Sequence, residues 1–220
     1  RGFNGWLHAD GYQGYHKLPS SIRVVGCWAH ARRKFEEALQ TLPKEMQKDS
    51  PAAIGECYCS RLFKLEQTFA GLTPEERYEK RLEQEKPVLD ALLSWVNEMQ
   101  VKTAPKSALG RAIHYLLEQW PYLTRYLEDG RLELSNNRAE RSIKPFVMGR
   151  KNWLFANTPG GAQASAVIYS LIETAKENKL DPYKYLLWVL QSAPGLSQAV
   201  EFWAEKLLPA NAPQECHVPQ

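Results

Sequence analysis

Two carboxylates stand where acidic side chains could do chemistry. Asp10 closes a short predicted strand, residues 6–10, and Gly11 follows it at once. Glu140 is the one acid in a basic, helix-like stretch, residues 138–151. Acids at a strand end and on a helix packed against the same sheet can converge on a pair of Mg²⁺ or Mn²⁺ ions. Two-metal phosphoryl transfer needs that arrangement.

Spacing alone leaves simpler interpretations open for both acids. An aspartate before a glycine is also a common turn residue, and Glu140 could pair with Lys144 one helical turn later. The bases around Glu140 favour a polyanionic partner, because a solvated helix face usually mixes its charges, although a solvated face remains the alternative. These bases are Arg138, Arg141, Lys144, Arg150 and Lys151.

Charge is unevenly distributed along the 220 residues, whose net charge is +3. Residues 36–98 hold thirteen acids against eight lysines and arginines. Residues 16–34 hold five bases, Arg32 and Arg33 among them, and no acid. Together with the six bases of residues 131–151, this pattern predicts a polyanion-binding surface in two parts, interrupted by an acidic insertion. Solvated charge without a partner is the alternative.

The elements that must position these residues begin with an α/β pattern. A β-branched run, residues 22–25, follows the first strand and leads through Gly26 into a helical stretch. A strand followed by a helix is typical of α/β folds. Residues 41–130 instead predict an all-helical insertion, with a helix start signal at Thr73, a kink or break at Pro87 and a break at Pro121.

Helices also dominate the last part of the chain. The helix that bears Glu140 should end near Pro145, and Gly149 should begin a turn. Residues 159–208 predict a C-terminal helical element, and the Pro-rich tail, residues 209–220, predicts disorder.

Cysteines and hydropathy indicate a reducing, aqueous compartment. The four cysteines form no C-x-x-C pair, so free thiols are expected, and a zinc site built from Cys27 with His30 or Cys216 with His217 is the alternative. No apolar run approaches the roughly 20 residues of a membrane helix, and no signal peptide is apparent. Because the chain begins at Arg1, just before a strand, we expect it to be a piece of a longer protein in the cytoplasm.

Four segments resemble bacterial transposases of the insertion-sequence-66 family. They are HADGYQGY, VVGCWAHARRKFEEAL, LSNNRAERSIKPFVMGRKNWLF and GGAQASAVIYSLIETAKENKLDPYKYLLWVL. The resemblance implies a DDE-class transposase with an RNase H-like α/β fold, predominantly helical overall. Residues 1–40 and 131–158 would form part of its catalytic core, with residues 41–130 as a large helical insertion and the C-terminal helices following.

The same resemblance assigns roles to the two acids. Asp10 would be the second catalytic aspartate and Glu140 the catalytic glutamate, and both would bind the two Mg²⁺ or Mn²⁺ ions of the intact enzyme. The first catalytic aspartate would lie on a strand upstream of Arg1. We therefore expect this chain by itself to be inactive, or nearly so.

Several neighbouring residues are candidates for supporting roles. Asn136 and Asn137 could orient the Glu140 carboxylate or merely cap its helix. His30 could contact phosphate or be an ordinary buried histidine. Trp153 could stack on a base or belong to the core. Arg32, Arg33 and the bases around Glu140 are the expected DNA contacts.

The leading hypothesis is a metal-dependent enzyme that hydrolyses and joins DNA at the ends of an insertion sequence. Its partner would be double-stranded DNA, on which it would form a homo-oligomer, with accessory proteins of the same element, near the nucleoid and without a membrane. The alternative is a non-catalytic DNA-binding or assembly remnant of a decayed element, which would need no metal. A generic RNase H-like nuclease would share the metal chemistry without the joining reaction.

Overall fold

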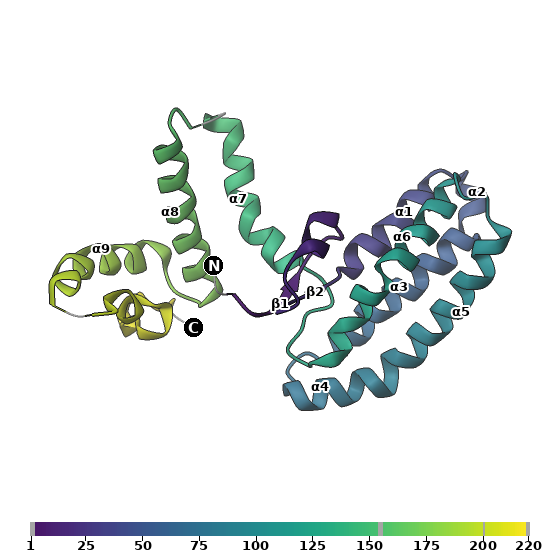
Figure 1. Cartoon of the computed structure of the whole chain (residues 1–220), viewed down its shortest axis with the longest axis horizontal. Helices are drawn as coiled ribbons and strands as arrows, with labels where there is room; N and C mark the ends of the chain where they lie inside the picture. The colour runs from purple at the N-terminus through teal and green to yellow at the C-terminus, as the bar shows by residue number, and fades with distance from the viewer. Residues whose placement is uncertain (1–2, 154–155, 200, 219–220) are drawn as a thin grey trace. The chain divides into compact units, whose positions relative to one another are not determined.

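The computed structural model describes residues 3–153, 156–199 and 201–218; for His16 and residues 150–153 it describes the backbone alone. The chain divides into two compact units, Arg1–Arg138 and Ala139–Gln220, and each is described by itself. Helices dominate both units, as the sequence predicts (Figure 1). Among the described helices, none is both long and apolar enough to cross a membrane.

A small parallel sheet opens the first unit. Strand β1 (Gly5–His8) pairs with β2 (Ile22–Val25), with Gly5 opposite Ile22 and His8 opposite Val25. The connection between them holds a 3₁₀ helix, η1 (Gln13–Lys17). Two parallel strands fit an α/β unit but do not identify the larger fold, so the RNase H-like core stays a prediction.

Four long helices form a bundle beside this sheet: α1 (Trp28–Gln40), α3 (Pro51–Thr68), α5 (Lys86–Lys102) and α6 (Ala108–Leu123), with the short α2 (Lys44–Gln47) between α1 and α3 (Figure 1). Their shared core includes Trp28, Phe35, Leu62 and Leu116, none of which exposes any surface. Val25 of β2 belongs to the same core. The strand, α1 and the predicted insertion therefore pack as one body.

The connection from α3 to α5 follows the predicted start signal. Thr73 caps α4 (Pro74–Lys80): its Oγ1 accepts from the Glu76 N–H at 3.2 Å, and the Glu76 carboxylate accepts from the Thr73 N–H at 2.9 Å. A π-helical turn, η2 (Arg81–Glu85), then leads into α5. Pro87 thus follows a widened turn, in which the Lys86 N–H donates to the Arg81 carbonyl five residues back, and the helix continues beyond the proline as α5.

Pro121 also lies inside its helix, α6, which passes into the 3₁₀ helix η3 (Thr124–Glu128). The predicted end of the Glu140 helix near Pro145 is wrong in the same way. Helix α7 (Asn137–Trp153) runs through Pro145 and Gly149. A proline removes one helical hydrogen bond, and the turns on both sides of it carry the helix on.

The second unit continues with α8 (Pro159–Glu177), α9 (Pro182–Ala199) and η4 (Trp203–Leu207). The sequence predicts disorder from residue 209, whereas residues 209–218 form two 3₁₀ helices, η5 (Pro209–Asn211) and η6 (Gln214–Cys216). Cys216 is buried against Leu180 and Tyr185, and its carbonyl accepts from the Asp181 N–H at 2.8 Å. A buried thiol and backbone pairing thus anchor a segment that its composition alone marks as unstructured.

Candidate active site

Asp10 lies in the loop directly after β1, with an exposed side chain. The backbone stays paired one residue beyond the strand, because the Ala9 N–H donates to the Val25 carbonyl at 3.0 Å. Asp10 Oδ1 accepts from the Tyr12 N–H at 3.1 Å. The carboxylate therefore shapes its own turn and still faces solvent, so the turn role and a ligand role are compatible.

Helix α6 holds this loop in place. The Tyr115 hydroxyl donates to the Asp10 carbonyl at 3.0 Å, across 105 positions of sequence. Gly11 has φ of +84°, and a Cβ there would come within 3.0 Å of Gln119 and Tyr115. Burial raises the pKa of Tyr115 to about 12, so the hydroxyl stays a hydrogen-bond donor even in mildly alkaline solution. The helical insertion thus positions the Asp10 backbone, a role that the sequence did not suggest.

The chain segment that leads into α7 is fixed in the core of the first unit. Leu132 and Leu134 are buried there, and the Leu134 carbonyl accepts from the Trp28 N–H at 3.1 Å. The Trp28 indole in turn donates to the Leu123 carbonyl at 2.9 Å. The start of α7 is therefore tied to the first turn of α1, which also carries His30, a half-buried residue.

Arg81 anchors the same segment from the other side. Its buried guanidinium donates to the Tyr126, Asp129 and Leu132 carbonyls at 3.0, 3.2 and 2.8 Å. It also forms a bidentate pair with the Glu66 carboxylate, at 2.6 and 2.9 Å. All five N–H donors of the side chain are thereby used.

Sequence reasoning missed Arg81, although a signal existed. Arg81 and Glu85 precede Val88 and Leu92 at helical spacing, so two charges fall on the apolar face of one helix. Such a pattern indicates a buried ionic network. Tyr126 completes it by donating from its hydroxyl to Glu85 Oε2 at 2.7 Å.

The two asparagines before Glu140 take different places. Asn137 is the first residue of α7, inside the helix. Asn136 precedes it, and its Oδ1 is buried without a hydrogen-bond partner. That oxygen therefore caps no backbone N–H of α7, and the orienting role for the Glu140 carboxylate stays a prediction.

Glu140 lies in the first turn of α7 with an exposed side chain, and Arg138, Arg141 and Lys144 are exposed on the same helix. Their spacing places acid and bases within two helical turns of each other. The side chains of three further candidates, Arg150, Lys151 and Trp153, lie outside the described part of the structure.

The two arginines of α1 differ. Arg32 is half-buried, with its Nε 3.0 Å from the Glu36 carboxylate and its guanidinium over the Phe63 ring at 4.9 Å. These contacts give it a packing role between α1 and α3. Arg33 is exposed, so it remains a candidate DNA contact.

Asp10 and Glu140 belong to different units, so the structure does not bring them together or hold them apart. Within the described residues, no three His, Cys, Asp or Glu side chains gather closely enough to hold a metal ion. The exposed Asp10 carboxylate nevertheless fits Mg²⁺ as a single oxygen ligand. The four cysteines form no disulfide, and Cys27 lies in the first unit and Cys216 in the second.

Comparison with known proteins identifies the family. The family described as "Transposase IS66 family" matches residues 1–164. This chain belongs to the IS66 transposase family. The IS66 C-terminal element matches residues 170–209, from the second half of α8 onward.

Relatives of this IS66 chain occur in Sinorhizobium fredii as proteins described as uncharacterized. One, y4qI, is 35% identical over 207 residues, which cover 90% of this chain and 37% of the relative. Another, y4jD, is 33% identical over 217 residues, covering 95% of this chain and 41% of the relative. The chain thus spans about two fifths of these relatives' length. No solved structure matches it.

Proposed function

We propose that the IS66 protein carrying this sequence cuts and joins DNA at the ends of a bacterial insertion sequence, using Asp10 and Glu140 as metal ligands. The observation that carries this proposal is the setting of Asp10. Its carboxylate is exposed at the carboxyl end of β1 in a parallel pair, where α/β folds place their ligands. The family membership supports the reaction class.

The larger core belongs to the same proposal. In the full-length protein, β1 and β2 would form part of an RNase H-like sheet, and α7 would bring Glu140 to the edge that Asp10 occupies. The insertion contributes through Tyr115, which holds the Asp10 backbone, and through Arg81, which fixes the segment entering α7.

The chemistry divides between the ions and the side chains. Asp10 and Glu140 would hold two Mg²⁺ ions, whose chemistry would be to activate the attacking oxygen and stabilise the leaving one. Asp10 and Glu140 supply carboxylate ligands. Arg138, Arg141 and Lys144 hold the phosphates and neutralise their charge. Water first breaks the phosphodiester at the element end, and the freed 3′-hydroxyl then attacks a target phosphodiester, displacing its 3′ oxygen.

Cleavage by the full-length protein tests this proposal. Asp10→Asn and Glu140→Gln should each abolish cleavage of an element-end duplex while leaving DNA binding largely intact. Glu133→Gln is the matched control, because Glu133 is an exposed acid a few residues before α7. Cleavage that survives either substitution shows the site assignment to be wrong. Binding without any Mg²⁺-dependent cleavage by the unaltered protein would favour a non-catalytic DNA-binding role.

A further inference from the structure

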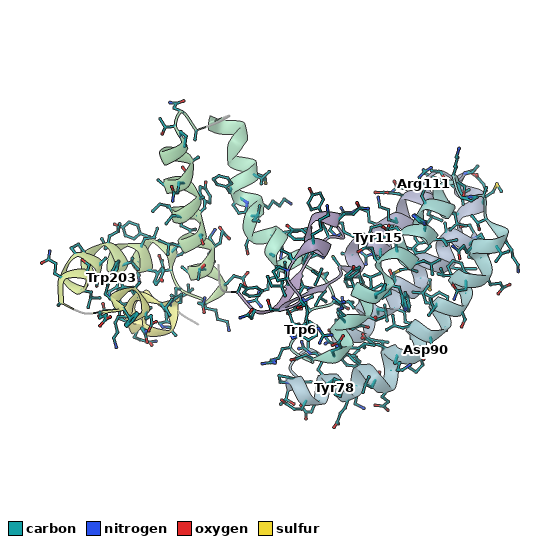
Figure 2. All side chains as sticks on the ribbon, viewed as in Figure 1. Trp6, Tyr78, Asp90, Arg111, Tyr115 and Trp203 are labelled. Atoms are coloured by element: carbon teal, nitrogen blue, oxygen red, sulfur yellow. The ribbon has the colours of Figure 1, made fainter. Side chains whose placement is uncertain are left out.

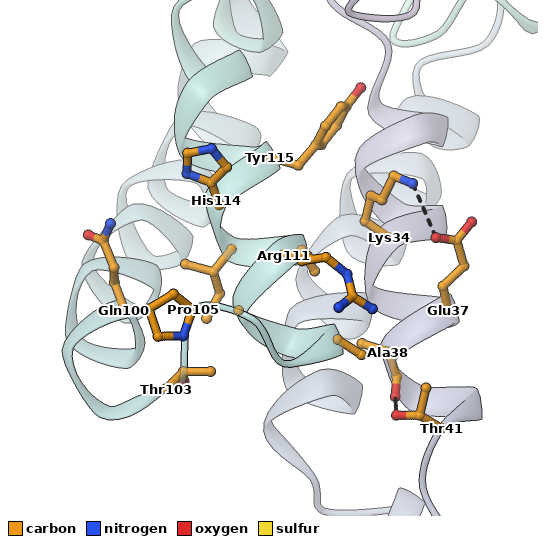
Figure 3. A pocket seen from close by; sticks show the side chains of 14 residues that line it. Lys34, Glu37, Ala38, Thr41, Gln100, Thr103, Pro105, Arg111, His114 and Tyr115 are labelled. Carbon is orange, nitrogen blue, oxygen red and sulfur yellow. Dashed lines mark hydrogen bonds and ion pairs between the residues drawn. The ribbon is translucent and has the colours of Figure 1, made fainter.

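A groove in the first unit follows the start of α6, with α1 on one side and Gln100, Thr103 and Pro105, from the end of α5 and the α5–α6 connection, on the other (Figure 3). It encloses about 720 Å³, and we call it the α1–α6 groove. Helix α1 contributes Lys34 and Glu37, and α6 contributes Arg111, His114 and Tyr115. Arg111 extends from α6 toward α1, as Figure 3 shows.

The groove lining carries a small excess of positive charge, Lys34 and Arg111 against Glu37, although the insertion as a whole is acidic. Residues 99–117, which include the first half of α6, contain three lysines and arginines, one histidine and no acid. On α1, Arg32, Arg33 and Lys34 outnumber the two acids, Glu36 and Glu37, that follow them. Charge complementarity therefore selects an anionic occupant here, despite the negative total of residues 36–98.

Glu37 is the one carboxylate among the lining residues that the structure describes, and Lys34 Nζ lies 3.2 Å from it. Arg111 donates one N–H to the Lys106 carbonyl, at 2.7 Å, which orients the guanidinium. Its other N–H groups remain available as donors to a ligand. The floor is apolar, with Ala38, Ala112 and Ile113 buried. An apolar floor with basic walls suits a nucleic-acid backbone, whose sugars could pack on the floor while its phosphates contact the basic side chains.

The groove and the loop that bears Asp10 are linked through Tyr115. Tyr115 lines the groove at one end and donates to the Asp10 carbonyl at 3.0 Å. Arg111 lies one helical turn away on the same helix, about 6 Å along its axis (Figure 2). A nucleic-acid strand that ran from Asp10 along α6 would contact Tyr115 and His114 first and Arg111 next.

We propose that the α1–α6 groove binds the sugar–phosphate backbone of DNA beside Asp10, with Arg111, His114 and Lys34 as phosphate contacts. This proposal rests on the proposed function and extends it, because it gives the helical insertion a direct part in holding substrate. Its occupant is a nucleic-acid strand, selected by the basic walls and by the connection to the Asp10 loop through Tyr115.

Fluorescence anisotropy with the whole 220-residue chain tests the groove. The probes are a labelled duplex of arbitrary sequence and the corresponding single strand, each titrated at several salt concentrations. The double variant Lys34→Ala/Arg111→Ala should weaken binding about tenfold and reduce the slope of log affinity against log salt by about one to two. The probe that loses more affinity identifies the form of DNA that the groove holds.

A matched control is available on the same unit. Lys80 forms the same i,i+3 ion pair as Lys34, with Glu83, and Arg61 is exposed on α3 as Arg111 is on α6. Neither residue lines the groove. The double variant Arg61→Ala/Lys80→Ala removes the same charge, so it should bind both probes with nearly unaltered affinity and salt slope.

Photo-crosslinking gives a second, independent measurement. An oligonucleotide with 4-thiothymidine should crosslink to peptides from residues 108–115, and the groove variant should lose this crosslink while melting at the same temperature. Unaltered binding and crosslinking by the groove variant would overturn the proposal. If Arg141→Ala/Lys144→Ala then weakens binding, the proposed function stands without the groove; if the unaltered chain binds neither probe, both proposals fail.

Discussion

The two units of this chain bury their side chains to very different extents. The first unit has an extensive core that joins β2, α1 and the insertion helices, with Trp28 and Leu116 fully buried. The described core of the second unit is a small cluster around Leu180 and Tyr185. Its first two helices instead expose apolar side chains, including Ile143, Val147, Val167 and Ile168.

This difference shows how the two candidate ligands are supported. The Asp10 loop is held by Tyr115 from a helix with a packed core, so its geometry follows from the folding of the first unit. Glu140 lies on α7, whose described side chains are mostly exposed. The stability of the first unit should therefore respond strongly to single substitutions, and that of the second unit weakly.

The largest expected effect comes from breaking the Arg81 network. Arg81→Met should lower the free energy of unfolding by about 3–5 kcal/mol, because it removes the charged partner of the half-buried Glu66 carboxylate and one hydrogen bond from each of three carbonyls. Chemical denaturation monitored by tryptophan fluorescence measures it. Arg131→Met is the control: Arg131 pairs with Asp129 at the surface and should matter little. Equal losses in the two variants would contradict the buried network.

A core leucine should matter more than an exposed one. Leu116→Ala should cost about 2–5 kcal/mol, since the side chain is fully buried and its removal leaves a cavity. Leu190→Ala makes the same change on α9, where the side chain is 64% exposed, and should alter stability by less than about 0.5 kcal/mol. Comparable losses of unfolding free energy in the two variants, measured by denaturant titration, would mean that Leu190 is buried in the folded second unit.

Stability should also fall as pH rises above the acidic range. Burial raises the pKa of Glu85 to about 8, and the Glu66 carboxylate adds to the effect. Between about pH 4.5 and 8 the folded chain therefore keeps a proton that the unfolded chain releases. The free energy of unfolding declines with pH through this window, by an amount on the order of a few kcal/mol.

Glu85→Gln isolates that effect, because glutamine mimics the protonated acid in shape. In the variant, the free energy of unfolding should no longer decline between pH 4.5 and 8. Burial also lowers the pKa of His8. Because His8 is present in both proteins, its contribution to the pH dependence cancels in the comparison. Thermal melts at half-unit pH intervals provide the measurement, and parallel curves for the two proteins would show that Glu85 is charged in the folded state.

The smallest effect is expected at the Asp10 loop. Tyr115→Phe removes the hydrogen bond to the Asp10 carbonyl and should cost about 0.5–1.5 kcal/mol. Hydrogen exchange should report faster opening of residues 9–12 in the variant. Tyr78→Phe, on the exposed surface of α4, serves as the control and should leave that exchange unaltered.

Local patterns in the sequence predicted the elements better than their long-range contacts. The Thr73 capping box and the strand before Gly26 depend on residues a few positions apart, and both are present in the structure. The end expected at Pro145 failed because a single lost hydrogen bond does not stop a helix with complete turns on both sides.

The support of the candidate site could not be predicted in this way. Arg81 binds carbonyls 45 to 51 positions away, and Tyr115 reaches Asp10 across 105. No periodicity within one helix encodes such pairings. The identity of the two acids came from a family resemblance, and their convergence on one pair of ions stays a prediction.

Metal rescue tests the central claim most directly. In the full-length protein, Asp10→Cys and Glu140→Cys should each abolish cleavage of an element-end duplex in Mg²⁺ and regain part of it in Mn²⁺, because Mn²⁺ accepts a thiolate ligand more readily than Mg²⁺. Glu133→Cys should cleave normally with either ion. Unimpaired cleavage by the Asp10 or Glu140 variant in Mg²⁺ would contradict the assignment of these carboxylates as the metal ligands.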